Sequence, residues 1–184
     1  LMARIYLYRG TEADRAEALK LADYLIDDVG TFDLVMSSYM STNRILSGET
    51  LFTLYKDDLS EVYESNFLYS YDSYGNLIWT GKLATRRADI NEMFNTAQWG
   101  ESKDGRLAKL MVNAGGYYFS TKYEQRDGDV QPAKCRIPLI RLAEMYYISA
   151  ECTDDLDKAT DRLADIWRAR GYGLPDLGIE TKED

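Results

Sequence analysis

The first 30 residues carry apolar positions at the spacing of helices. The run LMARIYLYR is apolar and compatible with a helix, and Gly10 interrupts it. Thr11 or Asp14 can cap a second helix, because a short polar side chain accepts a hydrogen bond from the first turn. The apolar residues of that second helix recur every three or four positions: Ala18, Leu19, Ala22, Leu25 and Ile26. The pattern predicts a helical hairpin over residues 1–30.

A second helical pattern begins at Ile137. The run IPLIRLAEMYYISAE is apolar on nearly every side, which is typical of a buried helix, and Pro138 suits a first helical turn. The next run, DDLDKATDRLADIWRAR, places five residues on one face: Leu156, Ala159, Leu163, Ile166 and Trp167. We therefore expect a second hairpin over residues 137–171, followed by a tail over 172–184.

The two predicted hairpins resemble each other. Ala3-Arg-Ile-Tyr-Leu aligns with Ala143-Glu-Met-Tyr-Tyr. Small residues on facing sides let paired helices approach closely, as in tetratricopeptide-like repeats, and such arrays need about three units for stability. We expect the hairpins to pack on each other, and partner repeats to lie outside this sequence. The residues expected at or near the contact are Ala3, Ala22, Ala143 and Leu163.

Residues 31–136 lack a persistent helical period and contain scattered Gly, Asn, Ser and Asp. Short elements are predicted within them: a strand over Thr50–Tyr55, helices over Leu59–Phe67 and Arg87–Phe94, and an extended segment over Tyr117–Tyr123. Long irregular stretches are usually functional. The expected fold is mostly α, with tetratricopeptide-like helical hairpins, a long irregular insertion carrying short strands, and one domain over residues 1–184.

Composition narrows the chemistry. The net charge of −9 argues against nucleic acid and against docking on anionic lipid, because both need a basic surface. The apolar runs are too short to cross a bilayer. The chain has no histidine, which removes histidine-dependent nucleophiles and histidine-ligated metals, so we expect no metal and no cofactor. Chemistry based on carboxylates stays possible.

The two cysteines, Cys135 and Cys152, flank the helix predicted from Ile137. At 1.5 Å per residue the ends of that helix lie roughly 20 Å apart. A disulfide needs Cα atoms within about 7 Å. We therefore expect two buried thiols and no bridge between them.

Aromatic residues gather in the irregular segment, where LYSYDSYGNLIW precedes a more distant Trp99. Flat aromatic faces cover the apolar side of a sugar ring, and carboxylates and amides bind its hydroxyls. The candidate ligand-binding residues are Trp79, Trp99, Tyr74, Asp72 and Asn76. For the two tryptophans, packing in a core is an equally good interpretation.

Several other conspicuous residues are expected to be structural. Tyr69 and Tyr71 alternate like a strand face that packs on the core. We interpret Asp104 and Arg106 as an ion pair or a loop anchor. Three aromatic residues of the second hairpin are expected in its core: Tyr146, Tyr147 and Trp167.

Four segments, in order, resemble the SusD/RagB family. The segment IPLIRLAEMYYISAE resembles the signature helix of the family. Earlier in the chain, LMARIYLYRG with the Ala-rich helix after it resembles the family's preceding repeat, and Asp104-Gly-Arg106 with YYFSTKY resembles the run-up to the signature helix. The segment RLADIWRARG resembles the helix that follows the signature helix. Together they cover most of the chain, with the middle matched loosely. The family's N-terminal portion with its lipidated cysteine, and the portion after the last helix, are not in this sequence, which resembles a central fragment.

The resemblance implies a function without catalysis. Family members are surface lipoproteins of the outer membrane in Bacteroidetes-type bacteria, where they bind oligosaccharides for polysaccharide utilisation. They act with TonB-dependent transporters of SusC type, and the membrane attachment is through an N-terminal lipid. Two alternatives stay open at this point: a tetratricopeptide-like protein–protein adaptor, and a glycosidase that uses carboxylates.

Overall fold

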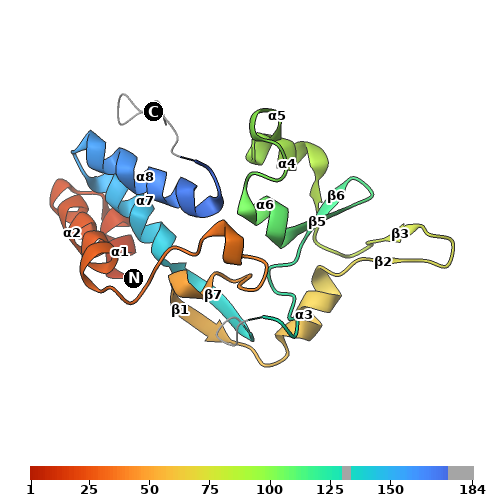
Figure 1. Ribbon diagram of the computed structural model, residues 1–184. Coiled ribbons are helices and arrows are strands. Elements are labelled where there is room, and N and C mark those ends of the chain that lie inside the picture. Colours follow the sequence, from red (N-terminus) through yellow and green to blue (C-terminus); the bar gives the residue numbers. More distant parts are fainter. Residues whose placement is uncertain (130–133, 174–184) are drawn as a thin grey trace. The chain divides into compact units, whose positions relative to one another are not determined.

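The computed structural model describes residues 1–129 and 134–173 (Figure 1). The chain divides into two compact units. The first unit comprises Leu1–Met36, Gly48–Thr53 and Pro138–Asp184, and the second comprises Ser37–Ser47 and Leu54–Ile137. Most of the predicted tail lies outside the described residues.

The first unit is built from two helical hairpins. Its helices are α1 (Met2–Arg9), α2 (Glu12–Asp23), α7 (Leu142–Cys152) and α8 (Leu156–Arg170), and α2 continues into a π-helical turn over Tyr24–Asp28. A side-chain cap begins one helix in each hairpin. Thr11 caps α2 by accepting a hydrogen bond from the Asp14 N–H, and Asp155 caps α8 through the Lys158 N–H. Gly10 ends α1 in the left-handed region, at φ 71°.

The two hairpins pack on each other, as the sequence predicted. α7 contacts both α1 and α2. Ala18 and Ala22 are completely buried, which allows the backbones of the helices to approach closely. Of the four residues expected at the contact, Ala3 and Ala22 lie in the shared core. The core consists of Ala3, Ala18, Ala22, Leu142, Met145, Ile148 and Cys152.

A polar network ties α2 to the second hairpin. The Asp23 carboxylate accepts hydrogen bonds from Ser149 Oγ at 2.7 Å and from Lys158 Nζ at 2.6 Å. Arg162 reaches both Asp23, at 3.2 Å, and Asp27, at 2.5 Å. Burial alone would raise the pKa of Asp23, but the hydrogen bonds from Lys158 and Ser149 outweigh it and hold the pKa below its ordinary value of 3.8.

This network makes the stability of the protein sensitive to acid. Because the folded-state pKa of Asp23 is lowered, its contribution is present above the ordinary value and is lost as the pH falls through the folded-state pKa. We expect Asp23→Asn to cost about 1–3 kcal/mol of unfolding free energy at neutral pH, as for a hydrogen bond to a charged group. The cost should shrink as the pH falls below 3.8 and through the lowered folded-state pKa, because the wild-type carboxylate then becomes protonated as well. Urea unfolding of both proteins across this range measures it, and a cost independent of pH would contradict it.

The predicted start of the signature helix is wrong. Residues Arg136–Arg141 form strand β7, which pairs with β1 (Thr50–Tyr55), and α7 begins only at Leu142. The β-branched Ile137 and Ile140 favour a strand, and a two-stranded sheet leaves each strand an open edge, where Pro138 needs no partner for its missing N–H. The apolar run alone did not separate a buried helix from a strand followed by a helix.

The aromatic residues of the second hairpin are less buried than the sequence predicted. Tyr147 is exposed, contrary to the expectation, and Tyr146 and Trp167 are half-buried. The Tyr146 ring lies under the Arg162 guanidinium, and the Trp167 ring packs on Tyr172. Because α7 is apolar on almost every side, the sequence did not show which of its faces stays open.

The second unit consists of short helices and two small antiparallel sheets. One sheet is the hairpin β2–β3, and the other has the strand order β4–β6–β5. The strands are β2 (Ser70–Tyr71), β3 (Leu77–Ile78), β4 (Thr85–Arg86), β5 (Met111–Ala114) and β6 (Tyr117–Ser120). The helices are α3 (Leu59–Asn66), α4 (Arg87–Met93), α5 (Thr96–Trp99) and α6 (Gly105–Leu110). The fold class is thus the predicted one, mostly α with helical hairpins and an insertion carrying short strands.

Buried side chains hold the helices of this unit on its sheet. Ile90 of α4, Leu107 of α6 and Tyr118 of β6 form a core, with Phe94 and Met111 packed against it. Asp104 caps α6 by accepting a hydrogen bond from the Arg106 N–H at 2.7 Å, and it also binds the Arg106 guanidinium. This pair is the structural anchor expected from the sequence.

Two further expectations concern the cysteines and membrane spans. Cys135 and Cys152 are both thiols, as predicted, although Cys135 is only half-buried. The strand found before α7 is longer per residue than a helix, which strengthens the argument that the two sulfurs lie apart.

Over residues 1–129 and 134–173, no helix has the length and apolar character needed to cross a membrane.

Candidate functional site

The predicted ligand-binding residues begin in the turn of the β2–β3 hairpin. Ser70 pairs with Ile78 and Tyr71 with Leu77, so residues 72–76 form the turn. Asp72 organises it, because its carboxylate accepts hydrogen bonds from the Tyr74 N–H at 2.9 Å and the Asn76 N–H at 2.8 Å. The Asn76 side-chain amide donates a third, at 2.9 Å.

These hydrogen bonds favour the ionised form of the Asp72 carboxyl group. The side-chain hydrogen bond from Asn76, followed by backbone hydrogen bonds, lowers the pKa of Asp72 below its ordinary value. An ionised carboxylate has about four acceptor positions, of which the turn uses three. Asp72 therefore shapes the loop and offers at most a single further acceptor to a ligand.

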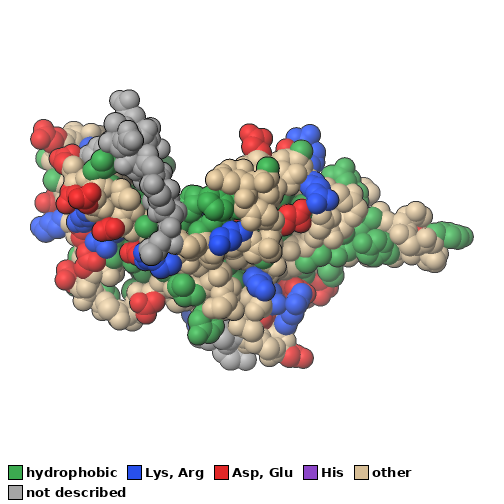
Figure 2. Space-filling model, turned by 45° about the horizontal axis from the view of Figure 1, so that its top comes forward, with side chains coloured by type: hydrophobic (Ala, Val, Ile, Leu, Met, Phe, Trp, Pro, Cys, Tyr) green, Lys and Arg blue, Asp and Glu red, His purple; other side chains and the backbone are tan. Residues whose placement is uncertain are grey.

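Tyr74 stands at the tip of this turn. Its side chain is 89 % exposed, and Gly75 next to it has φ 81°, a conformation that glycine adopts without strain. Figure 2 shows hydrophobic side chains along this projecting hairpin, and the exposed ones include Tyr71, Tyr74 and Ile78. An exposed tyrosine on a polar turn offers a ring face and a hydroxyl to a ligand.

Trp79 follows β3 at the base of the hairpin. It is 36 % exposed, and its ring lies 4.4 Å from the ring of Tyr117 with an interplanar angle of 32°. Tyr69, just before β2, packs on Phe119 with ring centroids 4.7 Å apart. Tyr117 and Phe119 are two residues apart on β6 and so point to the same face of that strand. β6 thus supports an aromatic surface whose outer layer is Trp79 and Tyr69.

A glycine lets the hairpin approach the β5–β6 turn. Gly115 has φ 58°, and a Cβ at this position would lie 2.7 Å from Leu77 Cδ2. A side chain here would push Leu77 of β3 away and strain the backbone. Gly115 therefore helps to position the strand that leads to Trp79.

Trp99 does not belong to this group of residues. It is the last residue of α5, is 37 % exposed and precedes Gly100. In Figure 1, α5 lies at the top of the picture, whereas the β2–β3 hairpin projects to the right. The structure thus brings together Asp72, Tyr74 and Asn76, places Trp79 on Tyr117, and leaves Trp99 on a separate helix.

Sequence reasoning missed Tyr117 as the support beneath Trp79. The signal was the aromatic pair in YYFS, which was identified only as an extended segment.

Within the part of the chain that the structure describes, no three His, Cys, Asp or Glu side chains are grouped to hold a metal ion.

Comparisons with known proteins show which solved structures share this fold. No family model matches the sequence, and no curated protein does. Solved structures match the chain over 98–99 % of its length. A SusD superfamily protein of Bacteroides vulgatus is 23 % identical, with a TM-score of 0.62 over 99 % of this chain. The chain has a SusD-like fold.

Two more structures support this conclusion. A SusD superfamily protein of Bacteroides thetaiotaomicron is 21 % identical, with a TM-score of 0.61 over 98 % of the chain. A protein of Bacteroides vulgatus, described as a candidate sugar-binding protein, is 25 % identical, with a TM-score of 0.65 over 98 %. The resemblance to SusD/RagB proteins is therefore confirmed.

The SusD-like chain spans less than half of these proteins. It covers 41 %, 42 % and 40 % of the three matched chains. The sequence thus corresponds to part of such a protein.

Proposed function

We propose that this SusD-like chain is part of a glycan-binding protein without catalytic activity, which serves an outer-membrane nutrient-uptake system. The observation that carries the proposal is the fold shared with SusD superfamily proteins, one of the three matched structures being a candidate sugar-binding protein. The exposed aromatic surface around the β2–β3 hairpin supports it, because sugar rings stack on such surfaces.

The proposed ligand site centres on Trp79. Its ring packs on Tyr117 and the residue is 36 % exposed, and Tyr74, Asp72 and Asn76 lie at the turn of the same hairpin. Trp79 would provide the stacking face, and the turn residues would bind sugar hydroxyls. Trp99, on α5, would be a further contact for a longer oligosaccharide.

The proposed partner is a TonB-dependent transporter of SusC type. The proposed location is the outer membrane of a Bacteroidetes-type bacterium, with the protein attached to the cell surface as a lipoprotein. Both proposals rest on the shared fold. Copurification of the transporter with the affinity-tagged full-length protein from membranes of the source bacterium tests the partnership.

A role in hydrolysis is not favoured by the carboxylate of the hairpin. A glycosidase needs a general acid whose pKa is raised, so that it carries a proton at working pH. The hydrogen bonds to Asp72 act in the opposite direction and lower its pKa.

We therefore expect the full-length protein to bind a neutral oligosaccharide and to leave it intact. Screening on a glycan array identifies ligands, and chromatography after long incubation with them should show unchanged chain lengths. Appearance of shorter products would support the glycosidase alternative. Failure to bind any glycan, together with capture of a defined protein partner, would support the adaptor alternative.

A further inference from the structure

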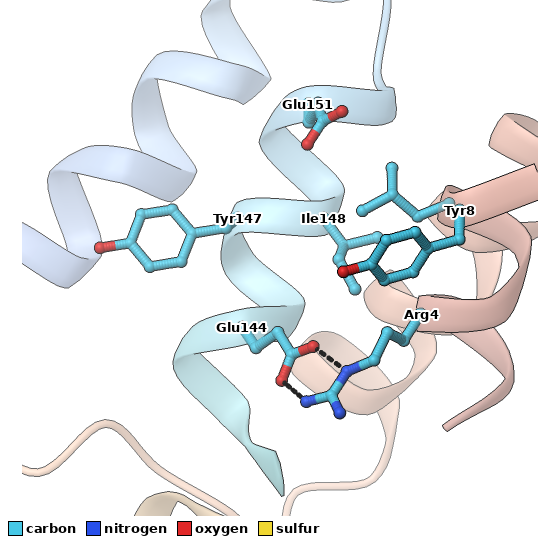
Figure 3. A pocket seen from close by; sticks show the side chains of 7 residues that line it. Arg4, Tyr8, Glu144, Tyr147, Ile148 and Glu151 are labelled. Carbon is cyan, nitrogen blue, oxygen red and sulfur yellow. Dashed lines mark hydrogen bonds and ion pairs between the residues drawn. The ribbon is translucent and has the colours of Figure 1, made fainter. Parts of the chain in front are cut away.

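A concave surface lies within the helical unit, far from the β2–β3 hairpin in sequence. A cavity of about 660 Å³ opens between α1 and α7 (Figure 3). Its walls include Arg4 and Tyr8 of α1, and Glu144, Tyr147, Ile148 and Glu151 of α7. This volume falls in the range of about 300–1,000 Å³ that is usual for small-molecule sites.

An ion pair forms one wall of the cavity. Arg4 Nε and Nη2 donate to the two Glu144 carboxylate oxygens, both at 2.5 Å, and Nη2 also donates to the Leu139 carbonyl at 3.4 Å. The pair is only partly covered, because about a third of each side chain is exposed. The hydrogen bond to Glu144 raises the pKa of Arg4. The two hydrogen bonds hold both groups in a defined orientation (Figure 3).

Two tyrosines add aromatic surface. Tyr8 is 86 % exposed although it lies on a helix whose other face is in the core, and Tyr147 is also exposed. In Figure 3 the Tyr8 ring lies beside Ile148 and above the Arg4 guanidinium, and Tyr147 extends from the other side of α7. An exposed ring next to a fixed network of donors and acceptors is the pattern that recognises a sugar.

The charges around the cavity are balanced. Glu144 is paired with Arg4, and Glu151 lies 3.7 Å from Arg15, whose guanidinium also donates to the Glu151 carbonyl. Two carboxylates and two guanidiniums leave no net charge to attract an ion.

We propose that this α1–α7 cavity is a second binding site for a neutral oligosaccharide, separate from the hairpin site. The ligand class rests on the proposed function, whereas the position rests on the cavity itself. Tyr8 supplies the stacking face, and the Arg4–Glu144 pair supplies fixed donors and acceptors for hydroxyls.

The test uses the full-length protein and a panel of neutral hexasaccharides built from glucose, xylose, mannose or galactose. Binding is measured by calorimetry in wild type and in Trp79→Ala, and Tyr8→Ala is then added to each. We expect Trp79→Ala to leave one class of sites, and Tyr8→Ala to weaken that class about tenfold or more, as for loss of a stacked ring. Tyr24→Ala is the matched control, because Tyr24 is an exposed tyrosine of the same unit outside the cavity.

The outcomes separate the two proposals. If Trp79→Ala abolishes all binding, or Tyr8→Ala changes affinity no more than Tyr24→Ala does, the second site is overturned and the proposed function stands. If wild type binds no member of the panel, both fail. A hexauronic acid that binds the cavity more tightly than the neutral sugars would overturn the charge argument and the ligand class with it.

Discussion

Replacing Arg170 with alanine should lower the free energy of unfolding by about 3–5 kcal/mol, because it leaves a buried carboxylate without its counter-charge. Arg170 is 4 % exposed and Glu49 is completely buried. The guanidinium donates to both Glu49 oxygens, at 2.6 and 2.9 Å. Glu49 also accepts from the Val35 N–H at 2.9 Å, and Arg170 donates to the Val35 carbonyl at 3.3 Å.

Urea unfolding measures this loss, and Arg168→Ala is the matched control. Arg168 lies on the same helix and pairs with Asp165 at the surface, where ion pairs contribute about 0–1 kcal/mol. Equal losses in the two variants would show that the buried pair contributes no more than a surface one.

A double variant separates the charge from the shape of this site. Arg170→Met alone leaves the Glu49 carboxylate unpaired, whereas adding Glu49→Gln removes that charge and keeps an acceptor for the Val35 N–H. We expect the double variant to recover part of the stability that Arg170→Met loses. A double variant less stable than Arg170→Met would argue that the lost packing, and not the unpaired charge, causes the effect.

Replacing Trp79 with alanine should weaken glycan binding by roughly ten- to a hundredfold, which corresponds to about 1–3 kcal/mol for a stacked ring. The ring has one face on Tyr117 and remains 36 % exposed, so a sugar can reach it. The loss of stability should be well below the 3–5 kcal/mol typical of a buried tryptophan.

Affinity and melting temperature should be measured side by side on the full-length protein. Tyr39→Ala is the control, because Tyr39 is an exposed aromatic of the same unit outside the proposed site. Reduced affinity with nearly unchanged melting supports the platform. Unchanged affinity with a large fall in melting temperature would mean that Trp79 serves packing alone.

Helix ends were readable because their causes are local. Thr11 and Asp155 cap the helices that follow them, and Gly10 and Gly171 end helices in the left-handed conformation that glycine adopts most easily. Each signal involves atoms within about four residues of one another. The strand Thr50–Tyr55 was also predicted with its observed limits.

The start of α7 could not be predicted from the sequence, because it depends on a contact with a distant segment. Residues 136–141 and the helix after them form a single apolar run, and only pairing with β1 makes the first part a strand. The exposure of Tyr147 has the same origin, because α7 is apolar on most faces and its neighbours decide which face they cover.

The sequence by itself determined the two helical hairpins, their close packing through small residues, and the membership of Asp72, Tyr74 and Asn76 in one polar turn. All of these depend on contacts at short spacing or on a repeated pattern. The tertiary structure decided that Trp79 packs on Tyr117 and that Trp99 lies on α5, away from the β2–β3 hairpin. It also decided that Glu49 pairs with Arg170, which is 121 positions away in the chain. Such pairs are made only when the folded backbone brings distant segments together, and no local spacing records them.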